Sequence, residues 1–178
     1  MTSAGNGRSE KQPSLEMAED AQAEFPLTKS EFDSIYSKVP RLSVEVLLTN
    51  DRGAILLTKR AIEPCTQWCV PGGTVYYGET LLEAVRRVGR RELNIDIVTA
   101  EFLGYVEYRS HYYQGIDSLV ALMFRVGRFT GVPTHNVEAS ASGWFTEIPD
   151  DIHPDVDRFL LDQGLIRSGS PPDPSSEG

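Results

Sequence analysis

The chain has 178 residues, of which 40% are hydrophobic and 24% charged, a composition typical of one globular domain with a substantial core. Its net charge of −9 argues against a protein that binds nucleic acid through a broad basic face. No apolar run reaches the ~18 residues that span a bilayer, and the N-terminus lacks the basic-then-apolar pattern of a signal peptide. We therefore expect a cytoplasmic protein without a membrane partner.

The two ends of the chain have a composition that does not build a core. Residues 1–24 are rich in Ser, Gly, Glu and Ala, and residues 167–178 are rich in Pro and Ser. Such segments bury too little apolar surface to offset the entropy of ordering. The sequence therefore predicts disordered tails at 1–24 and 167–178, with one folded domain at 25–166.

A short helix is predicted from Thr28 to Lys38. Thr28 and Glu31 form a capping box, and Pro40 ends the helix. Apolar residues follow at helical spacing, namely Phe32, Ile35, Tyr36 and Val39. This stripe must be covered either by the domain or by a second subunit, which makes a homodimer possible.

The periodicity changes to that of strands after Arg41. Residues 42–48 and 54–57 are mostly apolar and flank Asn50-Asp51-Arg52-Gly53, a pattern of strand, tight turn and strand. Glu45 stands among apolar neighbours, so it either faces solvent or points into a ligand pocket. Arg60 closes the second strand.

The stretch Gly72–Ile95 predicts a tight turn followed by a helix. Thr80 and Glu83 form a second capping box, and Asn94 suits the left-handed position that ends a helix. An apolar stripe at helical spacing comprises Leu81, Leu82, Val85 and Val88.

The remainder of the domain is mostly strand. We predict strands at 98–108, 117–129 and 141–148, an aromatic-rich loop at 109–115, and a final helix at 154–165. Strands outnumber helices in this pattern. The fold class is therefore α/β, with helices packed on a mixed sheet.

The turn and helix resemble the signature of the Nudix hydrolase family, G-x5-E-x7-R-E-U-x-E-E-x-G-U, where U is bulky and aliphatic. Trp68-x-x-Pro71-Gly72-Gly73 precedes it. The sequence matches this signature at Gly73, Glu79, Arg87, Glu92 and Ile95, and departs from it at Val88, Gly89, Arg91 and Asn94. The resemblance implies a single-domain α/β/α sandwich with a mixed sheet.

The signature has Glu at the positions of Val88 and Arg91. One branch of this family, the GDP-mannose mannosyl hydrolases, also lacks these two glutamates. The chain is similar to it at SVEVLLTNDRGAILLTKR and IHPDVDRFL as well. The similarity implies a divalent cation, Mg2+ or alternatively Mn2+, and a small-molecule nucleotide-linked substrate. The substrate it implies is a nucleotide sugar such as GDP-mannose, released as sugar and nucleoside diphosphate. The alternatives are cleavage of a pyrophosphate bond and a non-catalytic nucleotide-binding or regulatory domain.

The resemblance also implies the metal ligands. These are the Gly72 carbonyl, the Glu92 carboxylate and Glu138 in the loop before the last strand. Carboxylate and carbonyl oxygens suit Mg2+. The other reading for Glu92 is a surface ion pair with a nearby Arg, and for Glu138 an exposed loop position.

Other family positions suggest contacts with substrate. Arg87 is either catalytic or paired with Glu79 to brace the helix. Arg60 either binds phosphate or is exposed, and Glu45 matches an acidic position near the nucleotide. Tyr108 either stacks on a base or sugar or belongs to the core, as do Tyr105, Tyr112 and Tyr113.

The general base is the position where this sequence departs most from the branch. The branch places a His directly after the loop metal ligand, and this chain has Ala139 there. Glu138 is then the alternative base, and His111, predicted to lie solvated in a loop, is another.

Overall fold

The computed structural model describes residues 26–61, 66–136 and 139–168, within which the strands form two sheets. The larger sheet is mixed, with the order β4 (Gly72–Thr74), β1 (Arg41–Leu47), β6 (Leu119–Thr130), β5 (Asp96–Tyr108). The smaller sheet is antiparallel, with the order β3 (Trp68–Cys69), β2 (Ile55–Arg60), β7 (Ala139–Phe145). Strands β1 and β6 run parallel, whereas β4 and β5 pair antiparallel to their neighbours.

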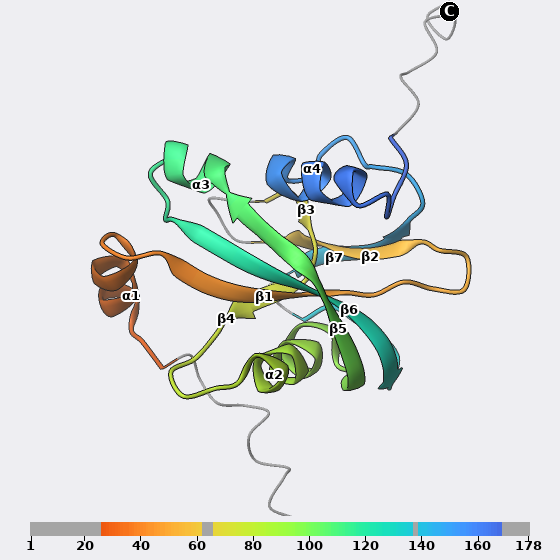
Figure 1. The fold of residues 1–178 in the computed structure, drawn as a ribbon, viewed down its shortest axis with the longest axis horizontal. Coiled ribbons are helices and arrows are strands. Elements are labelled where there is room, and N and C mark those ends of the chain that lie inside the picture. Colours follow the sequence, from red (N-terminus) through yellow and green to blue (C-terminus); the bar gives the residue numbers. More distant parts are fainter. Residues whose placement is uncertain (1–25, 62–65, 137–138, 169–178) are drawn as a thin grey trace, which may run out of the picture.

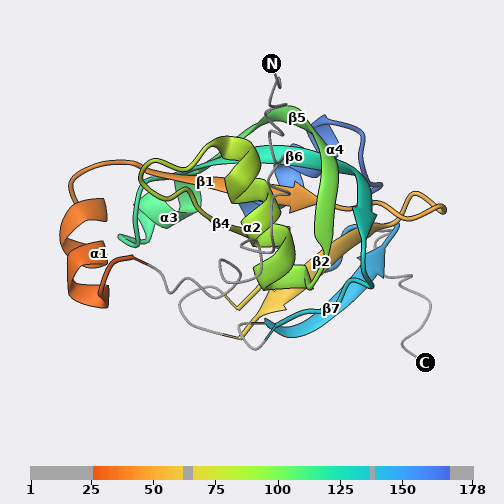
Figure 2. The same cartoon turned by 90° about the horizontal axis from the view of Figure 1, so that it is seen from below.

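Helices cover both sides of these sheets (Figure 1). They are α1 (Lys29–Tyr36), α2 (Leu81–Leu93), α3 (Arg109–Tyr113) and α4 (Pro154–Asp162). Figures 1 and 2 show α2 on one side, α3 and α4 on the other, and α1 apart from both layers near the start of β1. The predicted α/β sandwich with a mixed sheet is thereby confirmed. None of the helices in the described ranges is long and apolar enough to cross a membrane.

The core has one part on each side of β1. Val44, Val46 and Leu48 pack with Val85 and Val88 of α2. The alternate residue Leu47 packs in a second cluster that also contains residues of α4. Successive side chains of a strand point to opposite faces, so a strand covered on both faces is apolar throughout. Glu45 is two residues before Leu47 and therefore points to the same face of β1. Its side chain is only 4% exposed, which excludes the solvent-facing alternative.

Both predicted capping boxes are present. The side chain of Thr80 accepts from the Glu83 amide, and Glu83 accepts from the Thr80 amide at 2.8 Å. Thr28 and Glu31 form the same pair at α1. Asn94 ends α2 in the left-handed conformation, with φ 55° and ψ 39°, as its position after the helix predicted.

The predicted apolar stripe of α2 is only half correct. Leu81 and Leu82 are 39% and 40% exposed, because the first turn of the helix extends past the sheet. Gly89 completes the buried face instead. A Cβ atom there would lie 2.6 Å from Ile97 Cδ1, so the absence of a side chain lets α2 approach β5.

Three other expectations need correction. The strands before and after the turn at 50–53 belong to different sheets and meet only beside the turn, where the Leu56 amide donates to the Leu48 carbonyl at 3.1 Å. The predicted loop at 109–115 contains the short helix α3. Arg167, assigned to the second tail, pairs with Glu147 through the backbone in an isolated parallel β-bridge. Residues 1–24 and 169–178 of the predicted tails lie outside the described ranges.

Helix α1 has no buried residue, although the Arg41 guanidinium lies 5.5 Å from the Phe32 ring centroid. Ile35 is 41% exposed and Val39 is 49% exposed. The described residues of one chain therefore leave most of this apolar stripe uncovered. A homodimer that covers this stripe stays a prediction.

Candidate active site

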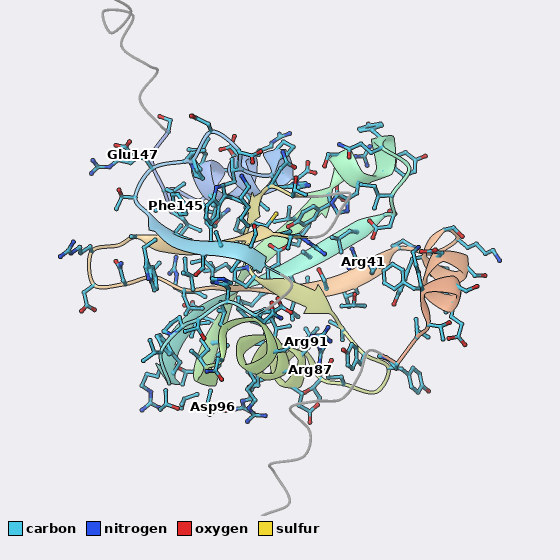
Figure 3. The ribbon with its side chains drawn as sticks, turned by 180° about the vertical axis from the view of Figure 1, so that it is seen from behind. Arg41, Arg87, Arg91, Asp96, Phe145 and Glu147 are labelled. Atoms are coloured by element: carbon cyan, nitrogen blue, oxygen red, sulfur yellow. The ribbon has the colours of Figure 1, made fainter. Side chains whose placement is uncertain are left out.

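A cavity of about 360 Å3 lies between α1, β1, β4 and α2. A neighbouring cavity of about 90 Å3 lies over the buried face of β1. Figure 3 shows Arg87 and Arg91 on the side of α2 that faces β4, and Arg41 on β1. Residues that line both cavities are Arg41, Arg60, Gly72, Gly73, Glu92 and His111.

The glycine turn lies directly against β1. Gly72 is opposite Glu45 in the β1–β4 pair. A Cβ atom on Gly72 would lie 2.7 Å from Glu45 Cγ and 2.9 Å from the Val44 carbonyl oxygen, so a side chain cannot fit without a shift of the backbone. This close approach places the Gly72 backbone in the walls of both cavities.

Arg87 fastens helix α2 to this turn. Its Nε and Nη2 atoms donate to the Glu79 carboxylate at 2.7 and 2.8 Å, and Nη2 also donates to the Thr74 carbonyl at 2.8 Å. Its guanidinium lies 3.6 Å from the Tyr76 ring centroid. Burial tends to raise the pKa of Glu79, but the hydrogen bonds from Arg87 and the Tyr76 amide lower it overall. These contacts correspond to the bracing alternative for Arg87.

Replacing Arg87 with Ala is expected to destabilise the fold by about 3 kcal/mol, because it leaves the Glu79 carboxylate and the Thr74 carbonyl without their partner. Arg90→Ala is the matched control on the same helix, since its ion pair with Asp96 is largely exposed and is expected to contribute less than about 1 kcal/mol. Urea unfolding of both variants measures the difference. Equal losses would contradict the bracing role.

Glu92 provides a carboxylate at the junction of the two cavities. Its Oε1 atom lies 3.7 Å from Arg91 Nε, a long ion pair, and its side chain is 18% exposed. Glu138 lies outside the described residues. Among the residues that are described, no group of three or more His, Cys, Asp or Glu side chains is placed to hold a metal ion.

Positive charge gathers around the larger cavity although the whole chain is acidic. Arg41, Arg60, Arg87 and Arg91 all line it. Arg91 occupies a signature position where the family pattern has Glu, and it donates from Nη1 to the Tyr76 hydroxyl at 3.3 Å. Arg41 was not predicted, because it precedes a strand and has no motif. Its partner Asp117, at 2.7 Å from Nε, is far away in the sequence.

A buried polar cluster forms the floor of the smaller cavity. Tyr108 donates a hydrogen bond to Glu45 Oε1, and Glu45 Oε2 has no hydrogen-bond partner among the described residues. Burial raises the pKa of Glu45 to about 7, against the opposing effects of the Tyr108 hydrogen bond and of the Arg41 and Arg60 charges. An orphaned buried oxygen suits a ligand that supplies a donor.

The tyrosines differ in their surroundings. The Tyr108 ring is 5% exposed and packs 5.0 Å from His111 and 4.8 Å from His153, so it belongs to the core rather than presenting a stacking face. Tyr105, Tyr112 and Tyr113 are exposed and do not line either of these two cavities. Tyr76, which the sequence did not single out, does line the larger cavity.

Two histidines are buried beside this cluster. His111, predicted to be solvated, is 6% exposed because α3 folds it back beneath β1 and against the first turn of α4. His153 caps α4 and is 2% exposed, and burial together with the charge of His111 lowers its pKa to about 4. The Ala139 position, where the mannosyl hydrolase branch has His, lines the smaller cavity.

Comparisons with known proteins agree with this architecture. The model of the NUDIX domain matches residues 39–162. The low-salt glycan biosynthesis protein Agl8 of Haloferax volcanii is 34% identical over 150 residues, which cover 78% of this chain and 94% of that protein.

Solved structures show the same fold. A MutT NUDIX hydrolase from Burkholderia pseudomallei superposes with a TM-score of 0.63 at 29% identity, over 70% of this chain and 98% of that one. A MutT protein from Methanosarcina mazei Go1 gives a TM-score of 0.61 at 21% identity, over 70% of this chain and 93% of that one.

Proposed function

This chain belongs to the NUDIX family, and from that premise we propose that it is a Mg2+-dependent hydrolase of a nucleoside diphosphate-linked compound. The proposed substrate is a nucleotide sugar such as GDP-mannose, released as free sugar and nucleoside diphosphate. The proposal of a sugar is supported by the Haloferax relative, which is named as a glycan biosynthesis protein. Cleavage of the pyrophosphate bond is the alternative, in keeping with the MutT hydrolase neighbours.

The observation that carries this proposal is the convergence of four arginines and two carboxylates, Glu92 and Asp117, on a single cavity. Arg41, Arg60 and Arg91 give the larger cavity positive charge, and Arg87 adds to it. A guanidinium fork is suited to phosphate oxygens. In a chain with a net charge of −9, this local surplus favours an anionic ligand.

The oxygen donors in this cavity fit Mg2+. Mg2+ in nucleotide sites commonly takes one or two carboxylates and completes its shell with phosphate oxygens and water. Glu92 supplies one carboxylate and the Gly72 carbonyl lies in the same walls, and we assign Glu138 as a further ligand. When bound, the cation acts as a Lewis acid that neutralises charge on the diphosphate.

The smaller cavity is proposed to hold the part of the substrate beyond the diphosphate. There Glu45 Oε2 accepts a hydrogen bond from a hydroxyl group of the sugar, which satisfies the orphaned buried oxygen. Tyr108 holds the other carboxyl oxygen and so fixes the orientation of Glu45. Arg60 lines both cavities and is proposed to contact the phosphates between them.

Product analysis tests this proposal. The protein is incubated with Mg2+ and a panel of nucleotide sugars and other nucleoside diphosphate derivatives in 18O-labelled water. Free sugar carrying 18O, together with nucleoside diphosphate, is the expected result. Sugar phosphate and nucleoside monophosphate would instead support pyrophosphate cleavage.

Loss of the family glutamates at Val88 and Arg91 favours one other outcome. A non-catalytic domain would be stabilised against heat by a nucleotide of the panel without forming any product. Thermal unfolding in the presence of each compound is therefore measured beside the product analysis. Stabilisation without turnover would replace the enzyme with a binding or regulatory domain.

A further inference from the structure

The buried cluster contains an aspartate–histidine pair that the proposed function has not used. His111 Nδ1 lies 3.0 Å from Asp117 Oδ1, and the other oxygen of Asp117 lies 2.7 Å from Arg41 Nε. The side chains of His111 and Asp117 are 7% and 3% exposed. His111 of α3, Asp117 in the segment before β6 and Arg41 of β1 thus form one hydrogen-bonded chain. His111 and Arg41 line both cavities, and Asp117 lines the larger one.

From this arrangement we propose that His111, held by Asp117, accepts the proton of the water that attacks the substrate. This inference rests on the proposed hydrolase function. His111 of α3 then supplies the general base that Ala139, at the start of β7, cannot provide. No other histidine lines both cavities among the described residues.

Asp117 sets the tautomer that the role requires. A carboxylate next to Nδ1 places the ring proton on Nδ1 and leaves the lone pair on Nε2, at the opposite edge of the ring. Burial tends to raise the pKa of Asp117, but the hydrogen bond from His111 and the charge of Arg41 lower it overall, which keeps the carboxylate ionised. The imidazolium that forms then lies beside a buried carboxylate, which Arg41 also contacts.

Other groups on the neighbouring elements also face His111. Tyr108 on β5 donates to Glu45 on β1, and its ring packs on the imidazole. The His153 ring lies 5.2 Å away in an edge-on contact and stays neutral because its pKa is about 4. Arg41 reaches the pair through Asp117.

The step is balanced without a co-reactant. The water oxygen forms a bond to the sugar carbon as the bond from that carbon to the diphosphate oxygen breaks. The electron pair of the broken bond leaves with the nucleoside diphosphate, and the water proton moves to His111 Nε2. If the attack is at phosphorus instead, the same proton transfer applies to the water.

The test compares His111→Asn with wild type on the substrate that the product analysis identifies. Asn keeps a donor near the Nδ1 position but has no Nε2, so we expect kcat to fall roughly 100- to 10,000-fold with KM changed less than about threefold. His111→Ala is expected to regain activity when imidazole is added. His135→Asn is the matched control, because His135 is exposed and pairs with Ser142, and its kcat is expected to be unchanged.

The role of Asp117 has a readout that does not depend on turnover. In 15N NMR spectra, His111 of the wild type is expected to be the Nδ1–H tautomer, and Asp117→Asn is expected to shift it toward Nε2–H. Circular dichroism of each variant confirms folding.

Two results would overturn the proposal while the hydrolase function stands, provided that wild type turns over substrate. One is a His111→Asn enzyme within about threefold of wild-type kcat. The other is a His111→Ala enzyme that imidazole does not rescue together with an unchanged tautomer in Asp117→Asn. A wild-type protein without any turnover would overturn both the hydrolase function and the role of His111.

Discussion

Glu92→Gln is expected to remove Mg2+-dependent turnover and to weaken divalent metal binding by about 100-fold or more, because the amide oxygen carries no charge. Substituting residues that merely support a metal ligand already reduces metal affinity by about 10- to 100-fold, so loss of a ligand carboxylate should do at least as much. Several Arg line the cavity around Glu92, and no group of three or more described His, Cys, Asp or Glu side chains is placed to hold the ion in its stead. Initial rates against Mg2+ concentration and calorimetric titration with Mn2+ measure both effects.

The matched control is Glu83→Gln on the same helix. Glu83 lies in the first turn of α2, and Gln at this position still accepts the hydrogen bond of the capping box. This variant is expected to bind metal and turn over substrate as wild type does. A Glu92→Gln protein that binds Mn2+ as tightly as Glu83→Gln would contradict the assignment of Glu92 as a ligand.

The stability of the metal-free protein is expected to depend on two buried groups whose pH effects oppose each other. Glu45 has a folded pKa of about 7, above its ordinary value of 4.5. The unfolded chain therefore releases this proton first, and stability is lost as pH rises from about 4.5 to 7. His153 has a folded pKa of about 4, below its ordinary 6.5, so its contribution is lost as pH falls from 6.5 to 4.

Each group alone gives a slope of about 1.4 kcal/mol per pH unit in its window, and the two slopes cancel between about pH 4.5 and 6.5. Glu45→Gln is expected to leave only the His153 effect, so that stability rises with pH in this range. His153→Asn keeps a residue that caps helices and is expected to leave the opposite slope. Urea unfolding in EDTA at pH 4.5, 5.5 and 6.5 measures these slopes.

The double variant serves as the control for these two slopes. It lacks both groups and is expected to be as flat as wild type over the same pH range. If Glu45→Gln has the wild-type slope, then Glu45 does not hold its proton in the folded protein, and its proposed environment is wrong.

Local interactions explain the features that the sequence predicted well. The capping boxes at Thr28 and Thr80 and the left-handed Asn94 depend on residues within a few positions of each other. The pair of Glu79 and Arg87 was predicted from the family signature and is present in the structure, because one helix and the turn before it carry both residues. The resemblance to the Nudix family is confirmed for the same reason, since its signature is a continuous segment.

The surroundings of the candidate site depended on contacts between distant segments. Glu45 could have faced solvent or a pocket, and only the packing of helices on both sides of β1 buried it. The stripe at Leu81 and Leu82 was overestimated because the sequence does not say how far a helix extends past its sheet. His111 was predicted to be an isolated loop residue, because no sequence pattern indicated its pairing with Asp117. That pair also includes Arg41 from β1.

By itself, therefore, the sequence determined the fold family, the turn and helix with their caps, and Glu92 as a carboxylate at the signature position. The tertiary structure decided which other side chains surround that carboxylate. Arg41 and Glu45 lie on β1, whereas Tyr108 ends β5 and His111 lies on α3, and no spacing along the chain relates the first two residues to the last two. Parallel pairing of β1 with β6 and the packing of α3 against α4 bring them together, which changes the electrostatics of each one through burial.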